Sequence, residues 1–383
     1  MNFAFKILGS GLLLLYLLLH YYVGLRSLQA LRVFYAPLKS YIFWAIFLMI
    51  AVSYIANRTL GLSLPFLNSI GSYWIAAFFY LLLFYLFLDL LILLDSTFDI
   101  FPSSWEIGFQ NKRIYSLALI LTTAVLIFGS WNAYNPQIVK YNLNIAKKIG
   151  GIEDLKLVMI SDLHIEGMTN TAYLETAAQT ITSLNPDFIL LAGDIVESTL
   201  DSATEEKLQR IIKNLKSKHG IYAVLGNHEY YGGHADKITA FLQAQGVTVL
   251  RDEFRETMEG KLYLVGRNDY RSGHFNPENR KNLDEILLGI DSSKPIILLD
   301  HQPQDVTEAK EAAIDLMLSG HTHGGQLFPV QLATKSLFLI DRGLYQENSF
   351  NLIVSTGLGL WGPPIRTSSR SEIVEINLTF RGY

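Results

Sequence analysis

Cysteine is absent from the 383 residues of this chain. That absence excludes disulfides, zinc–thiolate sites, iron–sulfur clusters and thiol nucleophiles. Charge is also scarce, because Asp, Glu, Lys and Arg make up 17% of the chain and the formal net charge is −4. Nucleic-acid-binding proteins usually carry a basic excess, so we expect no nucleic-acid partner.

Polar residues are rarest in residues 1–131, which are dominated by Leu, Phe, Ile and Tyr. A helix needs about 20 mostly apolar residues to span a bilayer. A buried bundle in a soluble protein is the alternative, but its helices would show a polar stripe, which these segments hardly do. We therefore predict a transmembrane region of about four helices, near residues 3–23, 41–56, 73–94 and 114–131.

The orientation of this region follows from its charges. The connections at residues 25–40 and 95–113 carry five basic residues, and the opposite side also carries five. Basic residues that lead into a long domain count for less, so we expect a multi-pass cell-membrane protein whose soluble domain lies outside the cytoplasm. Asp89 is the one acid deep in a predicted span; we expect it near the headgroups rather than on an ion path, and no second membrane acid stands out as its partner.

Residues 132–150 are predicted to form a linker with an edge strand at 138–145. From residue 151 to residue 383 the sequence is that of a soluble domain, in which short apolar strands alternate with helices. This alternation predicts an α/β layered fold. Five of the expected strands matter for the site, at residues 155–160, 187–192, 221–225, 295–299 and 314–318.

Each of these five strands ends directly in Asp, Asn or His, often beside a glycine. Ligand sites of α/β sheets gather at the carboxyl ends of the strands. A mixture of carboxylate, amide and imidazole ligands suits a transition metal or manganese. The candidate site residues are Asp162, His164, Asp194, Asn227, His228, His301, His321 and His323.

Taken in order, these motifs resemble those of the calcineurin-like metallophosphoesterases. The matching strings are Asp162-Leu163-His164, Gly193-Asp194, Gly226-Asn227-His228-Glu229, His301 and Gly320-His321-Thr322-His323. Longer strings, such as Asp300-His301-Gln302-Pro303, resemble the bacterial branch with YkuE- and YaeI-type proteins. The resemblance covers about residues 150–380 and implies two β-sheets packed face to face, with helices outside, in four layers.

The resemblance also implies two divalent metal ions, Mn, Fe or Zn, that share Asp194. The first ion would be bound by Asp162, His164, Asp194 and His323. The second would be bound by Asp194, Asn227, His301 and His321. Two cations about 3.5–4 Å apart can hold a hydroxide and a phosphate oxygen together, so attack by a metal-bound hydroxide needs no protein nucleophile.

Four residues outside the implied ligand sets have expectations of their own. The resemblance gives His228 a contact with the phosphate and a role in assisting the leaving oxygen, oriented by Glu229 or another acid. Arg366 is a candidate phosphate contact because a guanidinium binds phosphate in a bidentate manner, with a structural ion pair as the equal alternative. His234 is expected in a solvated loop, and His274 receives no role.

The resulting expectation is a membrane-anchored phosphoesterase that hydrolyses a phosphomonoester, a phosphodiester or a pyrophosphate. The nearby bilayer makes a lipid-linked substrate one candidate. The alternative is a catalytically silent membrane scaffold or sensor that binds metal and a phosphorylated ligand. Transport through the spans has little support because we expect no paired charges in the membrane half.

Overall fold

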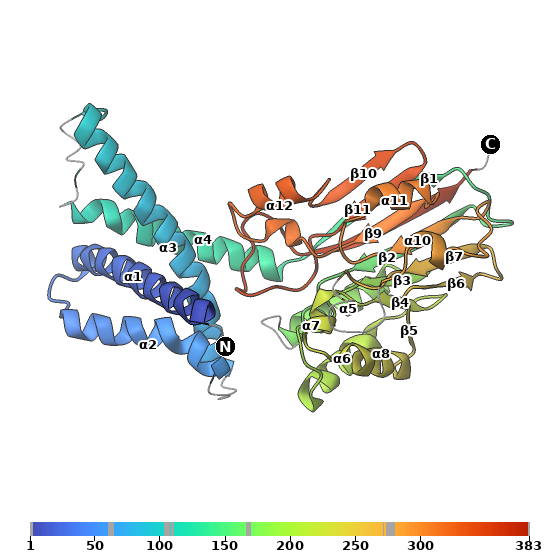
Figure 1. The fold of residues 1–383 in the computed structure, drawn as a ribbon, viewed down its shortest axis with the longest axis horizontal. Helices are drawn as coiled ribbons and strands as arrows, with labels where there is room; N and C mark the ends of the chain where they lie inside the picture. Colours follow the sequence, from blue (N-terminus) through green and yellow to red (C-terminus); the bar gives the residue numbers. More distant parts are fainter. Residues whose placement is uncertain are drawn as a thin grey trace. The chain divides into compact units, whose positions relative to one another are not determined.

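The computed structural model describes residues 3–59, 65–102, 108, 111–165, 170–270, 272 and 280–381. It divides into two compact units, Met1–Gly129 and Ser130–Tyr383. We call them the helical unit and the sheet unit (Figure 1). His274 lies outside the described residues.

The helical unit is built from long apolar helices that expose leucine and phenylalanine on their outer faces. Three stretches among the described residues are long and apolar enough to cross a bilayer: Ser10–Phe34, Phe66–Phe98 and Lys112–Tyr134. The second helix has a shorter apolar stretch, Ser40–Ser53. The expected all-helical N-terminal region is thus confirmed, with helices α1 (Phe3–Phe34), α2 (Ser40–Thr59), α3 (Pro65–Phe98) and α4 (Lys112–Tyr134).

A polar cluster lies among these apolar helices around Asp89. The Asp89 carboxylate accepts hydrogen bonds from Tyr22 at 2.8 Å and from Tyr115 at 2.7 Å. It also forms an ion pair with Arg26 at 2.7 Å. The expectation that the membrane half lacks paired charges is therefore wrong. The error arose because α1 continues to Phe34, which puts Arg26 on a helix rather than in a connection.

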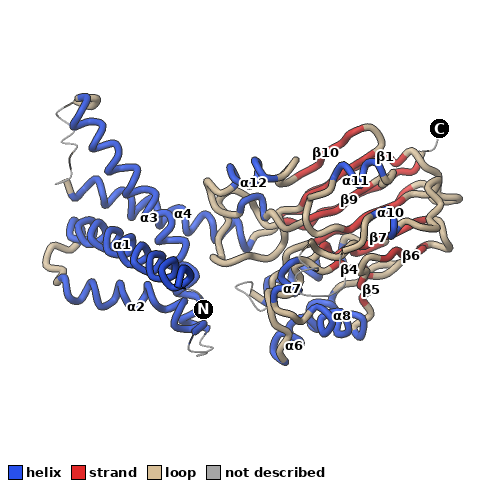
Figure 2. Tube along the Cα trace, viewed as in Figure 1, coloured by secondary structure: helices blue, strands red, loops and turns tan. Residues whose placement is uncertain are grey.

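The sheet unit contains two six-stranded mixed sheets, coloured red in Figure 2. In the first sheet the order is β1 (Gln137–Ile145), β12 (Glu372–Phe380), β2 (Asp154–Ile160), β3 (Phe188–Ala192), β4 (Ile221–Val224) and β5 (Val247–Val249). In the second it is β10 (Gly343–Glu347), β11 (Phe350–Val354), β9 (Leu316–Ser319), β8 (Ile296–Leu299), β7 (Leu262–Gly266) and β6 (Glu253–Thr257). Four neighbouring strands are parallel in each sheet. They are β2, β3, β4 and β5 in the first sheet. In the second sheet they are β7, β8, β9 and β11.

Alternate strand residues face opposite sides of each sheet, which explains the layering. Leu157 and Leu190 face the core between the sheets, together with Leu264 and Leu318 from the second sheet. Their neighbours face outward onto helices. Helices α5 (Thr171–Ser183), α6 (Ser202–Asn214) and α8 (Ala235–Ala244) cover the first sheet, and α10 (Leu283–Ile286) and α11 (Val306–Glu311) cover the second. The predicted α/β fold of two sheets between helices is confirmed.

The last turn of α4 belongs to the sheet unit and is held there by hydrogen bonds. Ser371 Oγ donates to the carbonyl of Ala133 at 2.7 Å, and Arg370 Nε donates to the carbonyl of Asn135 at 2.7 Å. Only residues 135 and 136 separate α4 from β1, which then pairs with β12. The segment 366–371 is therefore fastened to the end of a candidate membrane span.

Candidate metal centre

The candidate residues follow five strands that run in parallel within the two sheets. Parallel strands end at the same edge of a sheet, so the segments that follow them lie together. Asp162 and His164 follow β2, Asp194 follows β3, Asn227 and His228 begin α7 (Asn227–Tyr231) after β4, His301 follows β8, and His321 and His323 follow β9. All eight residues converge at this edge.

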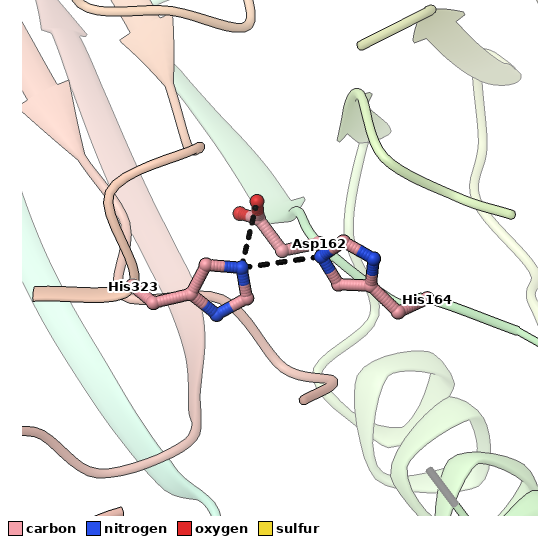
Figure 3. Close-up of side chains that lie close together, drawn as sticks. All are labelled: Asp162, His164 and His323. Carbon is pink, nitrogen blue, oxygen red and sulfur yellow. Dashed lines mark hydrogen bonds and ion pairs between the residues drawn. The ribbon is translucent and has the colours of Figure 1, made fainter. Parts of the chain in front are cut away.

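Asp162, His164 and His323 form the first group, in which the ring nitrogens face the carboxylate (Figure 3). His164 Nε2 and His323 Nε2 are 3.1 Å apart, and His323 Nε2 is 3.5 Å from Asp162 Oδ1. All three side chains are buried. Two imidazole nitrogens that face each other beside a carboxylate offer their lone pairs to a shared cation.

Asp194 links this group to a second one, which contains His301 and His321. Asp194 Oδ2 lies 3.1 Å from His301 Nε2 and 3.8 Å from His164 Nε2. His301 is oriented through its other nitrogen, since Nδ1 contacts the carbonyl of Ala192 at 2.8 Å. The carboxylate of Asp194 is thus placed where one group could serve two ions.

The backbone at the site is held in a conformation that L-residues rarely adopt. Asp162, His164, Asp194, His321 and His323 have positive φ angles of 55°, 46°, 50°, 70° and 50°. Left-handed non-glycine residues cost energy and persist at sites where the surroundings impose them. Such a concentration points to a functional constraint on the direction of these side chains.

Two motif glycines are required by close packing against the same carboxylates. A Cβ on Gly226 would lie 2.2 Å from Asp194 Oδ1, and a Cβ on Gly320 would lie 2.3 Å from Asp162 Oδ2. Any larger residue would displace the carboxylate. The glycines of the Gly-Asn-His and Gly-His-Thr-His strings therefore make room for the site.

The electrostatics of the site are divided. Burial opposes protonation of His164 and His301, but the carboxylates beside them outweigh it and raise the pKa of both imidazoles. Burial also raises the pKa of Asp162. Burial, together with positive charge nearby, lowers the pKa of His321 to about 3 and that of His323 well below its usual value. Burial opposes ionisation of Asp194, but the facing His301 outweighs it and lowers the pKa of that carboxyl. Neutral imidazoles and ionised carboxylates are the forms that bind metals.

Asn227 provides an independent test of whether the residues fit a metal ion. Its Oδ1 atom is buried and has no hydrogen-bond partner among the described residues. Its residue lines the same pocket as Asp194 and His321. A buried amide oxygen without a partner is unfavourable in a closed core and suits a ligand for a cation. The residues fit two divalent ions.

His228 lies beside the cluster with an acid that the sequence did not reveal. Its Nδ1 contacts the carbonyl of Glu197 at 2.8 Å and lies 3.8 Å from Glu197 Oε2. Glu197 also binds His164 Nδ1 at 2.7 Å. The alternative that Glu229 orients His228 is wrong, because both oxygens of Glu229 accept backbone N–H groups, at 2.8 Å and 2.7 Å. Glu197 is outside every motif, and the only sequence signal for it is its position three residues after Asp194.

Arg366 is not placed as a phosphate contact would be. It is fully buried behind His323, and its terminal nitrogens donate to the carbonyls of Gly357, Gly359 and His323. A guanidinium whose N–H groups are used in this way fixes the loop of His323 instead. His234 immediately precedes α8 and is half-buried, apart from the residues that line the pocket.

A cavity of about 370 Å³ opens onto the site. Its floor contains Asp194, Asn227, His228, His321 and His323. Its wall is largely apolar and is formed by Tyr231, Leu327, Val330, Phe338, Trp361 and Pro363. None of these wall residues belongs to a metal-binding motif, so no sequence pattern indicates that they line a site.

Residues 155–325 match the family model described as calcineurin-like phosphoesterase. An uncharacterized metallophosphoesterase of Helicobacter pylori J99 is 36% identical over 231 residues, which cover 59% of this chain and 60% of that protein. A zebrafish (Danio rerio) transmembrane protein with metallophosphoesterase domain is 32% identical, covering 68% of this chain and 62% of that protein. The chain thus spans less than two thirds of the length of these two relatives.

An uncharacterized metallophosphoesterase of Aquifex aeolicus is 32% identical over 263 residues, which cover 68% of this chain and 98% of that protein. This chain belongs to the calcineurin-like metallophosphoesterase family.

Proposed function

We propose that this protein is a membrane-anchored two-metal phosphoesterase that hydrolyses a phosphomonoester, phosphodiester or pyrophosphate bond. The observation that carries the proposal is the position of Asp194 between two groups of buried histidines. The proposed ligands are those of the two sets that share it: Asp162, His164, Asp194 and His323 for one ion, and Asp194, Asn227, His301 and His321 for the other. When bound, Mn, Fe or Zn ions would stabilise charge on the attacking and leaving oxygens of the ester.

The protein's own residues would orient the ester and move a proton. His228 lies at the pocket, outside the proposed ligand sets, and its Nδ1 is occupied by the carbonyl of Glu197 at 2.8 Å. Nε2 is then the atom that passes a proton to the leaving oxygen. The Glu197 carboxylate, bound to His164 at 2.7 Å, holds that proposed ligand in one orientation.

The membrane anchor is supported by the three apolar helices and by the zebrafish and bovine relatives named as transmembrane proteins. We also propose that the sheet unit lies outside the cytoplasm. Arg32 and Lys39 flank the α1–α2 connection, and Lys112 and Arg113 begin α4, which suits connections on the cytoplasmic side. Protease cleavage of the sheet unit in intact cells checks this side; protection there would reverse the orientation.

The function is tested with the purified full chain, stripped of metal and reloaded with manganese, iron or zinc. Soluble phosphomonoesters, phosphodiesters and pyrophosphates are offered in parallel. We expect hydrolysis of at least one class with metal and none after chelation. Metal uptake at two ions per chain without hydrolysis of any class would instead support the scaffold or sensor.

A further inference from the structure

An exposed apolar surface borders the cavity of the candidate metal centre. We call it the apolar rim. Its side chains are 41–75% exposed. Other exposed large hydrophobic side chains in the described part of the sheet unit are scattered, at Trp131, Ile138, Tyr231, Tyr270 and Leu288. The rim consists of Phe328, Val330, Leu332, Leu337, Leu339 and Trp361.

The rim contributes little to the folded core. Helix α12 (Gln331–Leu337), which carries Leu332 and Leu337, has no buried residue. These two leucines are 65% and 75% exposed. Concentrated apolar exposure of this kind marks a surface that binds something apolar.

The rim is continuous with the wall of the cavity. Val330 and Trp361 belong to both, and Phe338 of the wall lies between rim residues in sequence. Gln326 joins the two segments, because its Nε2 donates to the carbonyls of Trp361 at 2.7 Å and Pro363 at 3.0 Å. An apolar group on the rim could therefore be covalently attached to a phosphate in the cavity.

The rim is also fastened to the segment that holds the end of α4. Phe328 N donates to Thr367 Oγ1 at 2.8 Å, and Thr367 N donates to the carbonyl of Gln326 at 2.8 Å. Arg370, three residues further on, binds the carbonyl of Asn135 at 2.7 Å. The three residue steps from Thr367 to Arg370 cover at most about 11 Å. The end of a candidate membrane span and the rim thus share one short segment, which favours lipid over a protein partner.

The charge of the rim agrees with this occupant. Between Gln326 and Ile340 the sequence contains no Asp or Glu and one lysine, Lys335, which is exposed. A single basic residue among apolar ones suits the anionic headgroup region of a bilayer.

We propose that the apolar rim binds the hydrocarbon part of a membrane lipid whose phosphate ester enters the cavity. The substrate class would then be a phosphate ester of a lipid. The identification of the substrate rests on the proposed function, whereas the lipid contact of the rim does not.

The lipid contact is tested first, without any activity. Because the chain has no cysteine, Leu337→Cys and Leu288→Cys each give one site for a spin label on the full chain. Leu288 is 76% exposed and lies outside the rim, so it is the matched control. In vesicles of phosphatidylcholine and phosphatidylglycerol, we expect the label at 337 to be reached by oxygen more than by a water-soluble nickel chelate. The label at 288 should show the reverse, and equal aqueous access at both positions would overturn the proposal.

The substrate class is tested with one phosphate ester presented in two forms, as a soluble short-chain compound and on a diacylglycerol in vesicles. The double variant Leu332→Gln with Leu337→Gln should lower the ratio of the vesicle rate to the soluble rate about tenfold, since it removes apolar contact area. Leu288→Gln should leave the ratio unchanged. An unchanged ratio in the double variant would overturn the lipid assignment. If the wild type cleaves neither form, the proposed function fails, and the label experiment still decides the lipid contact.

Discussion

Each unit of the protein contains a cluster of polar side chains, half-buried in the helical unit and largely buried in the sheet unit, and the two differ in how many of their polar atoms have partners. In the helical unit the Asp89 carboxylate forms an ion pair with Arg26 and accepts hydrogen bonds from Tyr22 and Tyr115, all within 2.8 Å. In the sheet unit Asn227 Oδ1 has no partner among the described residues, and His164 and His323 turn their nitrogens toward each other at 3.1 Å. The Asp89 carboxylate thus has its full set of partners, whereas the polar atoms of the second cluster are arranged as they would be around a ligand.

The backbone shows the same difference. Arg26, Asp89 and Tyr115 lie inside regular helices, whereas five of the proposed ligands have left-handed φ angles of 46–70°. A complete cluster stabilises its own structure. A strained and incomplete one has the features of a ligand-binding site.

The largest effect is expected at the carboxylate between the two groups. Asp194→Ala should remove metal and turnover together and lower hydrolysis more than about a thousandfold, beyond the cost of one catalytic hydrogen bond. Metal content by elemental analysis and initial rates measure both losses. The matched control is Asp284→Ala, at an exposed acid in α10. Normal metal content in Asp194→Ala would remove the distinction between the clusters.

The stability of the polar cluster around Asp89 should depend on charge balance and not on metal. Asp89→Leu leaves Arg26 unpaired and should destabilise the helical unit by about 3 kcal/mol, as should Arg26→Leu. The double variant should recover most of that loss, because neither charge remains buried alone. Thermal unfolding of the full chain in detergent measures this, with and without chelator. Dependence on metal would show that this cluster, too, is a binding site.

His228→Ala should separate binding from catalysis in the sheet unit. We expect full metal content and a loss of turnover of about a hundredfold, typical of a missing proton donor. The effect should be smaller for esters with good leaving groups, such as nitrophenyl phosphates, because these need less protonation. A variant that loses its metal would place His228 among the ligands.

The smallest effect is expected at Glu197, which orients rather than binds. Glu197→Gln should weaken metal affinity about tenfold, because the His164 imidazole loses its charged partner. Competition with a fluorescent chelator measures the affinity. Glu206→Gln, at an exposed acid of α6, is the control, and equal affinities in all three proteins would deny Glu197 its positioning role.

The sequence predicted that the candidate residues follow strand ends, because a short apolar run precedes each motif. Short strands such as β5 and β6 were not predicted, since three to five residues show little periodicity. Glu197 and the apolar rim were not predicted because their significance depends on neighbours distant in sequence. The Arg26–Asp89 pair was missed for a related reason, the underestimated length of α1.

The junction between α4 and β1 consists of residues 135 and 136 alone. Two residues extend at most about 7 Å, so the tether between α4 and β1 is short. If the proposed lipid ester is the substrate, its encounters with the site would be governed by lateral diffusion in the membrane rather than by its concentration in the surrounding fluid. Inserting a flexible spacer at this junction would lengthen the tether while leaving every residue of the site in place.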